Sequence, residues 1–250
     1  MSGHSKWSTI KRKKGAADAK RGALFGKLSK AITVAAREGG GDLEMNPALT
    51  LAVHKAKEAN MPNDNIQRAI DKGTGAGADA ETIERITYEG YAPGGVAVLV
   101  EVLTDNRNRA ASDVRYIFSK NGGKLGTSGS VAYLFERKGV ILVPREGVDE
   151  DELIELALEA RAEDVEPMES DYRVVTAPGD FIAVRDSLRE AGITFENSEI
   201  TMQPQNSVDL DAATARQTLR LIDALEENDD VQEVHANFDI SEEVMTEVAG

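Results

Sequence analysis

The sequence predicts an α+β multidomain protein with three parts: an N-terminal three-helix domain, a middle α+β domain and an inserted ferredoxin-like βαββαβ domain. Three observations carry this prediction. Apolar residues recur with the helical period up to residue 73, and with a period of two from Ile83 onward. A self-contained βαββαβ pattern then fills residues 133–206 and leaves a short tail. We expect domains at 1–77, at 78–132 together with 207–250, and at 133–206.

Residues 16–37 are predicted to form the first helix. Its apolar stripe consists of residues at spacings of four, four and three: Leu24, Leu28, Ile32 and Ala35. A separate face carries four cations: Lys20, Lys27, Lys30 and Arg37. We therefore expect one side of this helix to pack while the other side stays charged and available.

Two shorter helices complete the first domain. Asn46 is a good N-cap and Pro47 suits the first helical position, so a helix is predicted from there toward Asn60. A third helix follows Met61-Pro62 and ends at Gly73. The glycine-rich stretch 73–77 is then expected to be a linker.

The middle domain begins with two predicted strands, 86–91 and 96–103, joined by the turn at 92–95. Residues 104–106 supply caps for a helix that reaches Phe118 and stops at the glycines after Asn121. This polar loop and the Gly/Ser-rich segment that follows the helix offer ordinary caps and stops on a structural interpretation. On a functional interpretation they are contacts for phosphate.

The inserted domain is read from its element order. Strands are predicted at 133–143, 164–168, 172–176 and 197–202, with helices from Asp149 and over 181–191. The remaining tail is an amphipathic helix through Leu219 and a strand at 231–238. Because so few residues cannot bury a core alone, the tail must return to the middle domain, whose strands have only one helix to cover them. Residues 133–206 are therefore expected to be an insertion.

Charge is distributed very unevenly along the chain, whose net charge is −15. Through Gly75 there are 14 Lys/Arg and 7 Asp/Glu, whereas the remainder holds 15 and 37. A negative protein repels polyanions, so a concentrated basic arm on it indicates an aimed contact, most commonly with nucleic acid. A solvated tail is the alternative.

Other functions find little support in the sequence. Cysteine is absent, and His4, His54 and His235 have no partners at ligand spacing, so we expect no metal and no cofactor. The acidic clusters fall in first turns of helices, where they favour the helix dipole. No P-loop is present, and we expect no enzyme activity and no small-molecule substrate. The longest apolar stretch, 96–103, is too short for a bilayer, and no signal sequence precedes it.

Several motifs together resemble the YebC family. They are GHSKW at Gly3, KRKKG at Lys11, NPAL at Asn46, MPNDNIQRAI at Met61, YEGYAPGGVA at Tyr88, TDNRNR at Thr104 and GGKLGTSGSVAYLF at Gly122. This family includes probable bacterial transcriptional regulators and the mitochondrial translational activator of cytochrome oxidase. The resemblance implies three domains arranged as above. Mitochondrial members carry an extension before GHSKW; this chain starts two residues ahead of it, so the resemblance implies a bacterial, cytoplasmic protein.

The resemblance leaves two functions open. One is a ribosome-associated translation factor that contacts ribosomal RNA and eases elongation at proline-rich sequences; the other is a duplex-DNA-binding transcriptional regulator. No recognition helix with several base-reading side chains is evident, which weakens the second. Trp7 offers stacking, which suits RNA. The candidate nucleic-acid-binding residues are Lys6, Trp7, Lys11, Arg12, Lys13, Lys14, Lys20, Arg21, Lys27, Lys30, Arg107, Arg109 and Lys124.

Overall fold

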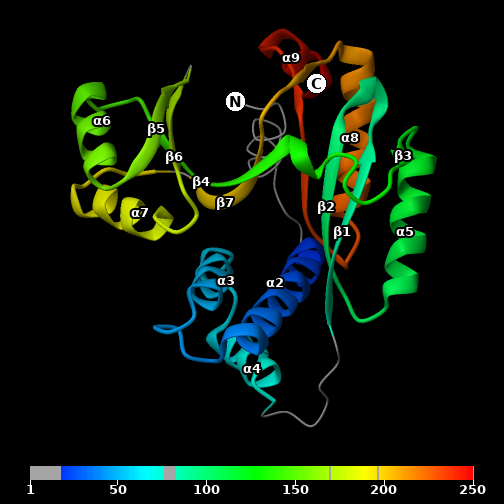
Figure 1. Cartoon of the computed structure of the whole chain (residues 1–250), viewed down its shortest axis with the longest axis horizontal. Coiled ribbons are helices and arrows are strands. Elements are labelled where there is room, and N and C mark those ends of the chain that lie inside the picture. Colours follow the sequence, from blue (N-terminus) through cyan, green and yellow to red (C-terminus); the bar gives the residue numbers. More distant parts are fainter. Residues whose placement is uncertain (1–17, 76–82, 169, 196, 250) are drawn as a thin grey trace. The chain divides into compact units, whose positions relative to one another are not determined.

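The computed structural model describes residues 18–75, 83–168, 170–195 and 197–249. It has the predicted mixed α+β architecture, with a helical N-terminal region followed by two four-stranded antiparallel sheets (Figure 1). Residues Tyr133–Asn206 form one compact unit, and the other described residues form a second. The expected boundary at residue 77 falls in 76–82, outside the described residues.

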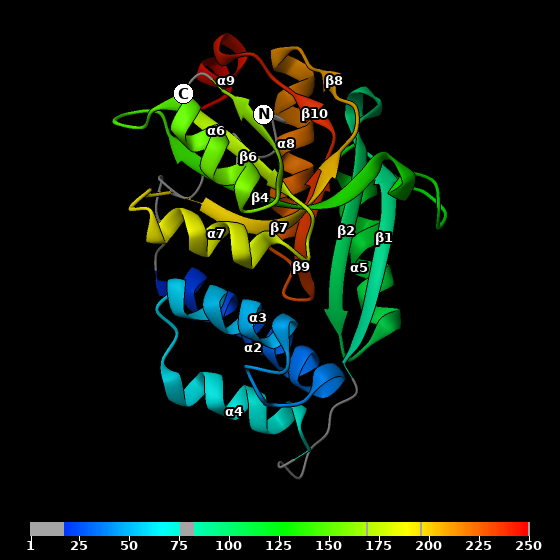
Figure 2. The ribbon, with the colours of Figure 1, turned by 60° about the vertical axis from the view of Figure 1, so that its left-hand side comes forward.

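The helical region consists of α2 (Asp18–Gly39), α3 (Pro47–Glu58) and α4 (Asn63–Gly73), which lie together in Figure 2. The Asn46 side chain accepts a hydrogen bond from the Leu49 backbone N–H, which confirms the predicted cap. Ile32 and Leu49 are fully buried between the helices. Leu24 is the exception to the predicted apolar stripe, since it is 45% exposed near the start of α2.

The middle sheet has the strand order β3-β1-β2-β9, with β1 (Glu84–Tyr91), β2 (Ala97–Thr104), β3 (Lys124–Leu125) and β9 (Val231–Ala236). A 3₁₀ turn, η1 (Pro93–Gly95), joins β1 to β2. The tail returns to this sheet as expected: β9 pairs antiparallel with β2, placing Val234 opposite Val100. Val100 and Val234 are 134 residues apart in the sequence, yet they lie on neighbouring strands.

Two helices cover one face of this sheet, α5 (Arg107–Lys120) and α8 (Ala212–Glu226). Val98, Val100 and Val102 alternate along β2 and share one buried core with both helices. Leu103 points the other way and clusters with Ile83 and with Val34 of α2. Because both faces of β2 are covered, its sequence is almost continuously apolar.

Three small elements complete this unit. β8 (Val208–Asp209) pairs in parallel with β10 (Phe238–Asp239), and α9 (Glu242–Ala249) packs against α8 with Met245 buried. Sequence analysis did not predict α9. Val244, Met245 and Val248 recur at helical spacing, but about two turns are too few to identify a helix without the α8 surface against which α9 packs.

The unit 133–206 has the predicted βαββαβ order after a short 3₁₀ turn, η2 (Ala132–Leu134). Its elements are β4 (Phe135–Pro144), α6 (Glu150–Glu159), β5 (Ala162–Pro167), β6 (Asp171–Thr176), α7 (Phe181–Glu190) and β7 (Asn197–Pro204). The sheet order β5-β6-β4-β7, antiparallel throughout, is that of the ferredoxin-like fold. Leu153 of α6 and Phe181 of α7 are fully buried.

Candidate nucleic-acid interface

The basic arm contributes six of the thirteen residues proposed from the sequence, and it lies outside the described part of the chain. Those residues are Lys6, Trp7, Lys11, Arg12, Lys13 and Lys14. Lys20 falls in the first turn of α2, but its side chain is also outside the description. Arg21, one position further on, is exposed.

The cations in the middle of α2 contact the chain itself. Lys27 Nζ donates a hydrogen bond to the Glu226 carbonyl at 2.5 Å, and Lys30 Nζ donates to Asp230 Oδ1 at 2.6 Å. Arg37 donates to the Ile83 carbonyl. The expectation that this face stays available is therefore corrected at Lys27 and Lys30, whereas Arg37 stays exposed while it makes its hydrogen bond. The physical reason is that α2 packs on two sides, against α3 and α4 and against the middle sheet.

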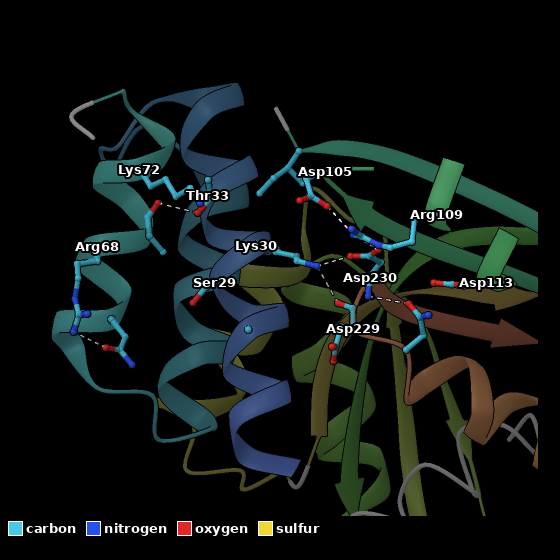
Figure 3. A pocket seen from close by; sticks show the side chains of 15 residues that line it. Ser29, Lys30, Thr33, Arg68, Lys72, Asp105, Arg109, Asp113, Asp229 and Asp230 are labelled. Atoms are coloured by element: carbon cyan, nitrogen blue, oxygen red, sulfur yellow. Dashed lines mark hydrogen bonds and ion pairs between the residues drawn. The ribbon is translucent and has the colours of Figure 1, made fainter. Parts of the chain in front are cut away.

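Asp230 collects cations from two elements. We use the name Asp230 cluster for Asp230, Lys30, Arg109 and Thr104. The Asp230 side chain is 6% exposed and accepts hydrogen bonds from Lys30 and from Arg109 Nη2 at 2.8 Å (Figure 3). It also accepts one from Thr104 Oγ1 at 3.0 Å. Burial alone would raise the pKa of Asp230, but these hydrogen bonds outweigh it and hold the pKa below its usual value.

Arg109 has a structural partner that the sequence did not reveal. Besides Asp230, its guanidinium binds Asp105 Oδ1 at 2.7 Å, and the two carboxylates raise the Arg109 pKa further. The same contact lowers the pKa of Asp105. A cation at the start of a helix opposes the helix dipole. Asp105 and Asp230 compensate this cost for Arg109, whereas Arg107 is exposed at the first position of α5.

A cleft of about 790 Å³ lies beside the Asp230 cluster, between α2, α4 and the start of α5. Its charged lining consists of four cations and four acids: Lys30, Arg68, Lys72, Arg109, Asp105, Asp113, Asp229 and Asp230. Since the two signs balance, the cleft offers no net attraction to a polyanion. Within the described residues, no group of three or more His, Asp or Glu side chains is placed to hold a metal ion.

The described helices were compared with the length and apolar composition of a membrane span. None of the helices in the described ranges combines the length and the apolar composition that a bilayer crossing needs.

The Gly/Ser-rich loop after α5 is organised by a buried carboxylate. Glu89 Oε1 accepts from the Gly129 N–H at 2.6 Å, and Oε2 accepts from Val131 and Ala132 at 2.7 and 2.8 Å. Burial opposes ionisation of Glu89, but these backbone hydrogen bonds prevail and lower its pKa. Gly126 N–H is also occupied, by the Glu89 carbonyl. Of the two interpretations left open for this segment, the structural one therefore holds at Gly126 and Gly129, whose N–H groups are occupied and do not face phosphate.

The exposed cations of the middle sheet's outer helix form a group that sequence reasoning only partly found. Arg107 and Lys124 were proposed, and both are exposed. Arg115, Tyr116 and Lys120 were missed, although all three are exposed on α5. The available signal was the helical period: read at 100° per residue, residues 107–120 separate an apolar face from a polar one that carries these side chains.

Comparisons with known proteins cover nearly the whole chain. Residues 5–76 match a family model described as the TACO1/YebC protein N-terminal domain, and residues 83–238 match one described as the TACO1/YebC second and third domain. A probable transcriptional regulatory protein of Rubrobacter xylanophilus is 78% identical, with all of both chains covered. Another, from Syntrophus aciditrophicus, is 57% identical over 249 residues, again with both chains covered in full.

A solved structure is also similar. The crystal structure of a conserved hypothetical protein from Aquifex aeolicus aligns with a TM-score of 0.79 at 51% identity. The alignment covers 90% of this chain and 93% of that one.

Proposed function

This chain belongs to the TACO1/YebC family, whose similar members are named probable transcriptional regulatory proteins, and we propose that it regulates gene expression by binding nucleic acid on the ribosome. In this proposal it is a cytoplasmic translation factor that contacts ribosomal RNA and eases elongation at proline-rich sequences. It supplies no catalytic group and takes no cofactor.

The observation that carries the proposal is the basic arm on an acidic chain. The first thirty residues hold nine Lys/Arg and one acid, in a protein of net charge −15. Because Lys27 and Lys30 of this stretch are engaged with Glu226 and Asp230, the arm itself, from Lys6 to Lys14, is left as the main source of phosphate contacts. Trp7 within it offers an aromatic face for unpaired bases.

The loop at 104–109 takes a more specific part in this proposal. Arg107 is exposed and Arg109 is held by Asp105 and Asp230, so Arg107 makes the contact and Arg109 fixes the loop. A guanidinium can bind phosphate with two hydrogen bonds or stack on a base. We propose that Arg107, with Lys124, touches ribosomal RNA near the site of peptide-bond formation and assists slow substrates such as proline by positioning.

Binding to duplex DNA as a transcriptional regulator is the second candidate, and the names of the similar bacterial proteins favour it. Phosphate contacts from the arm serve either target. The two candidates differ in the nucleic acid that the protein should prefer. Stacking on Trp7 requires unpaired bases, and these are absent from duplex DNA.

A salt titration tests the arm. Replacing Lys11, Arg12, Lys13 and Lys14 with alanine should weaken binding to ribosomal RNA by orders of magnitude and lower the log–log salt slope by roughly three. A matched control exchanges each Lys and Arg for the other cation and should keep the slope. A 20-base-pair duplex DNA serves as the competing probe. An unchanged slope in the alanine variant would show the arm to be a solvated tail, and preference for the duplex would favour the second candidate.

A further inference from the structure

The outer side of α5 is a basic surface with an aromatic side chain in it. We use the name α5 face for five residues on and beside this helix: Arg115, Tyr116 and Lys120 on its outer side, Arg107 at its first position, and Lys124 on β3 just after it. All five are exposed, and Tyr116 is 62% exposed. Ala110, Val114 and Phe118 hold the inner side of the helix in the core, away from Arg115, Tyr116 and Lys120, so the backbone beneath these three side chains is fixed. At 1.5 Å per residue, Arg107 and Lys120 lie about 20 Å apart along the helix axis.

Cations are concentrated here against the trend of the chain. After Gly75 the sequence holds 15 Lys/Arg and 37 Asp/Glu, yet residues 107–124 contain five of the cations and a single acid, Asp113. That acid lines the cleft beside the Asp230 cluster. Ordinary solvation of a helix surface in an acidic protein gives no reason for such a segregation of charge.

The α5 cations are also unneutralised. Within this segment, Arg109 is the cation that forms ion pairs, with Asp105 and Asp230. Across the ranges that the structure describes, Arg107, Arg115, Lys120 and Lys124 have no carboxylate partner. Arg107 and Arg115 lie close enough that both charges act on the Tyr88 hydroxyl, where they oppose the rise in pKa that burial causes. The surface therefore keeps a positive potential at both ends of the helix.

Tyr116 gives this surface a second recognition element. Lys120 Nζ lies 5.6 Å from the centroid of its ring, a cation–π distance that keeps the cation beside the aromatic side chain. The exposed residues between Arg115 and Lys120 on the helix surface are small and polar: Asn108, Ser112 and Ser119. A chain of phosphates can approach such a low ridge from either side while a base stacks on Tyr116.

We propose that the α5 face is a second nucleic-acid contact, which binds an unpaired stretch of RNA through phosphates on its cations and a base on Tyr116. The inference rests on the proposed function, because it assumes an RNA target, but it concerns residues separate from the arm. Duplex fits the surface less well: paired bases are already stacked and leave Tyr116 without a partner.

The test measures binding of a labelled, unstructured 12-nucleotide RNA to the full chain in a salt titration. The double change Arg115→Ala with Lys120→Ala should lower the log–log slope by about 1.4, near 0.7 for each phosphate contact to a single strand. Tyr116→Ala should weaken binding about tenfold with an unchanged slope, and Tyr116→Phe should restore it. Arg220→Ala is the control, because Arg220 is an exposed cation on α8 in the same unit.

Four results would overturn the inference. Slopes and affinities equal to wild type in all α5 variants, while the arm variant still lowers the slope, would leave the proposed function standing and remove the α5 face from it. Equal losses on RNA duplex and on the single strand would show a plain electrostatic surface. Unchanged RNA binding together with lost sedimentation with ribosomes would identify a ribosomal protein as the partner. If the arm variant is also unchanged, the proposed function fails with the inference.

Discussion

Single residues decide how the loops around the site are shaped. Glu89 is buried yet ionised, and it occupies the N–H groups of Gly129, Val131 and Ala132. The sequence did not predict this burial, because a glutamate in a strand is expected to face solvent unless the loop that folds over it is known. The loop's glycines were visible in the sequence, but the acceptor that satisfies them lies some forty residues earlier.

Replacing Glu89 with glutamine should destabilise the protein. The amide turns an N–H donor toward backbone donors, so at least one buried N–H loses its acceptor, which costs about 2–3 kcal/mol in free energy of unfolding. Because the folded pKa of Glu89 is lowered, its contribution is present above the unfolded pKa and is lost as pH falls through the folded pKa. Urea unfolding at neutral pH and at stepwise lower pH should show the two proteins converging in acid.

Glu84→Gln on the same strand is the control for this comparison, since Glu84 is exposed. It should leave both the stability and its dependence on pH unchanged. A Glu89→Gln protein whose stability deficit stays constant down to acid pH would contradict the assigned role of Glu89.

At the scale of elements, α2 is the helix whose prediction was half right. Its apolar stripe was recovered from Leu28, Ile32 and Ala35, which lie in or against the helical core. The role of its cationic face was not, because Lys30 and its partner Asp230 are 200 residues apart and nothing local connects them. Periodicity shows that a face is polar, but only the tertiary fold shows what covers it.

Asp230→Asn should loosen the attachment of α2 to the middle sheet. Lys30 and Arg109 lose their shared carboxylate, so we expect the free energy of unfolding to fall by about 1–3 kcal/mol and amide exchange in α2 to accelerate. Asp229→Asn removes the same charge from an exposed neighbour whose backbone carbonyl is the contact, and it should have little effect. Equal exchange rates in the two variants would show that the Asp230 cluster contributes nothing to this attachment.

At the scale of the whole molecule, the sequence predicted the fold class and the βαββαβ element order of the unit 133–206 correctly. The prediction succeeded because the apolar periods and the turn residues of each segment agree with the element that the segment forms in the fold. We propose domains at 1–77, at 78–132 with 207–250, and at 133–206. The site was less accessible from sequence. Five of its proposed cations are Lys or Arg of the arm, and three others are held within the fold: Lys27 by a backbone carbonyl, and Lys30 and Arg109 by the Asp230 carboxylate.

Ribosome profiling in a deletion strain, with chromatin occupancy measured in parallel, tests the central claim most directly. We predict that deletion increases pausing at proline-rich codons and that the wild-type chain removes it. The arm alanine variant and Arg107→Ala should each fail to do so, because one loses phosphate contacts and the other loses the contact at the loop. Unchanged pausing in the deletion strain, with altered transcript levels and occupancy at promoters, would contradict the claim and identify the protein as a regulator acting on DNA.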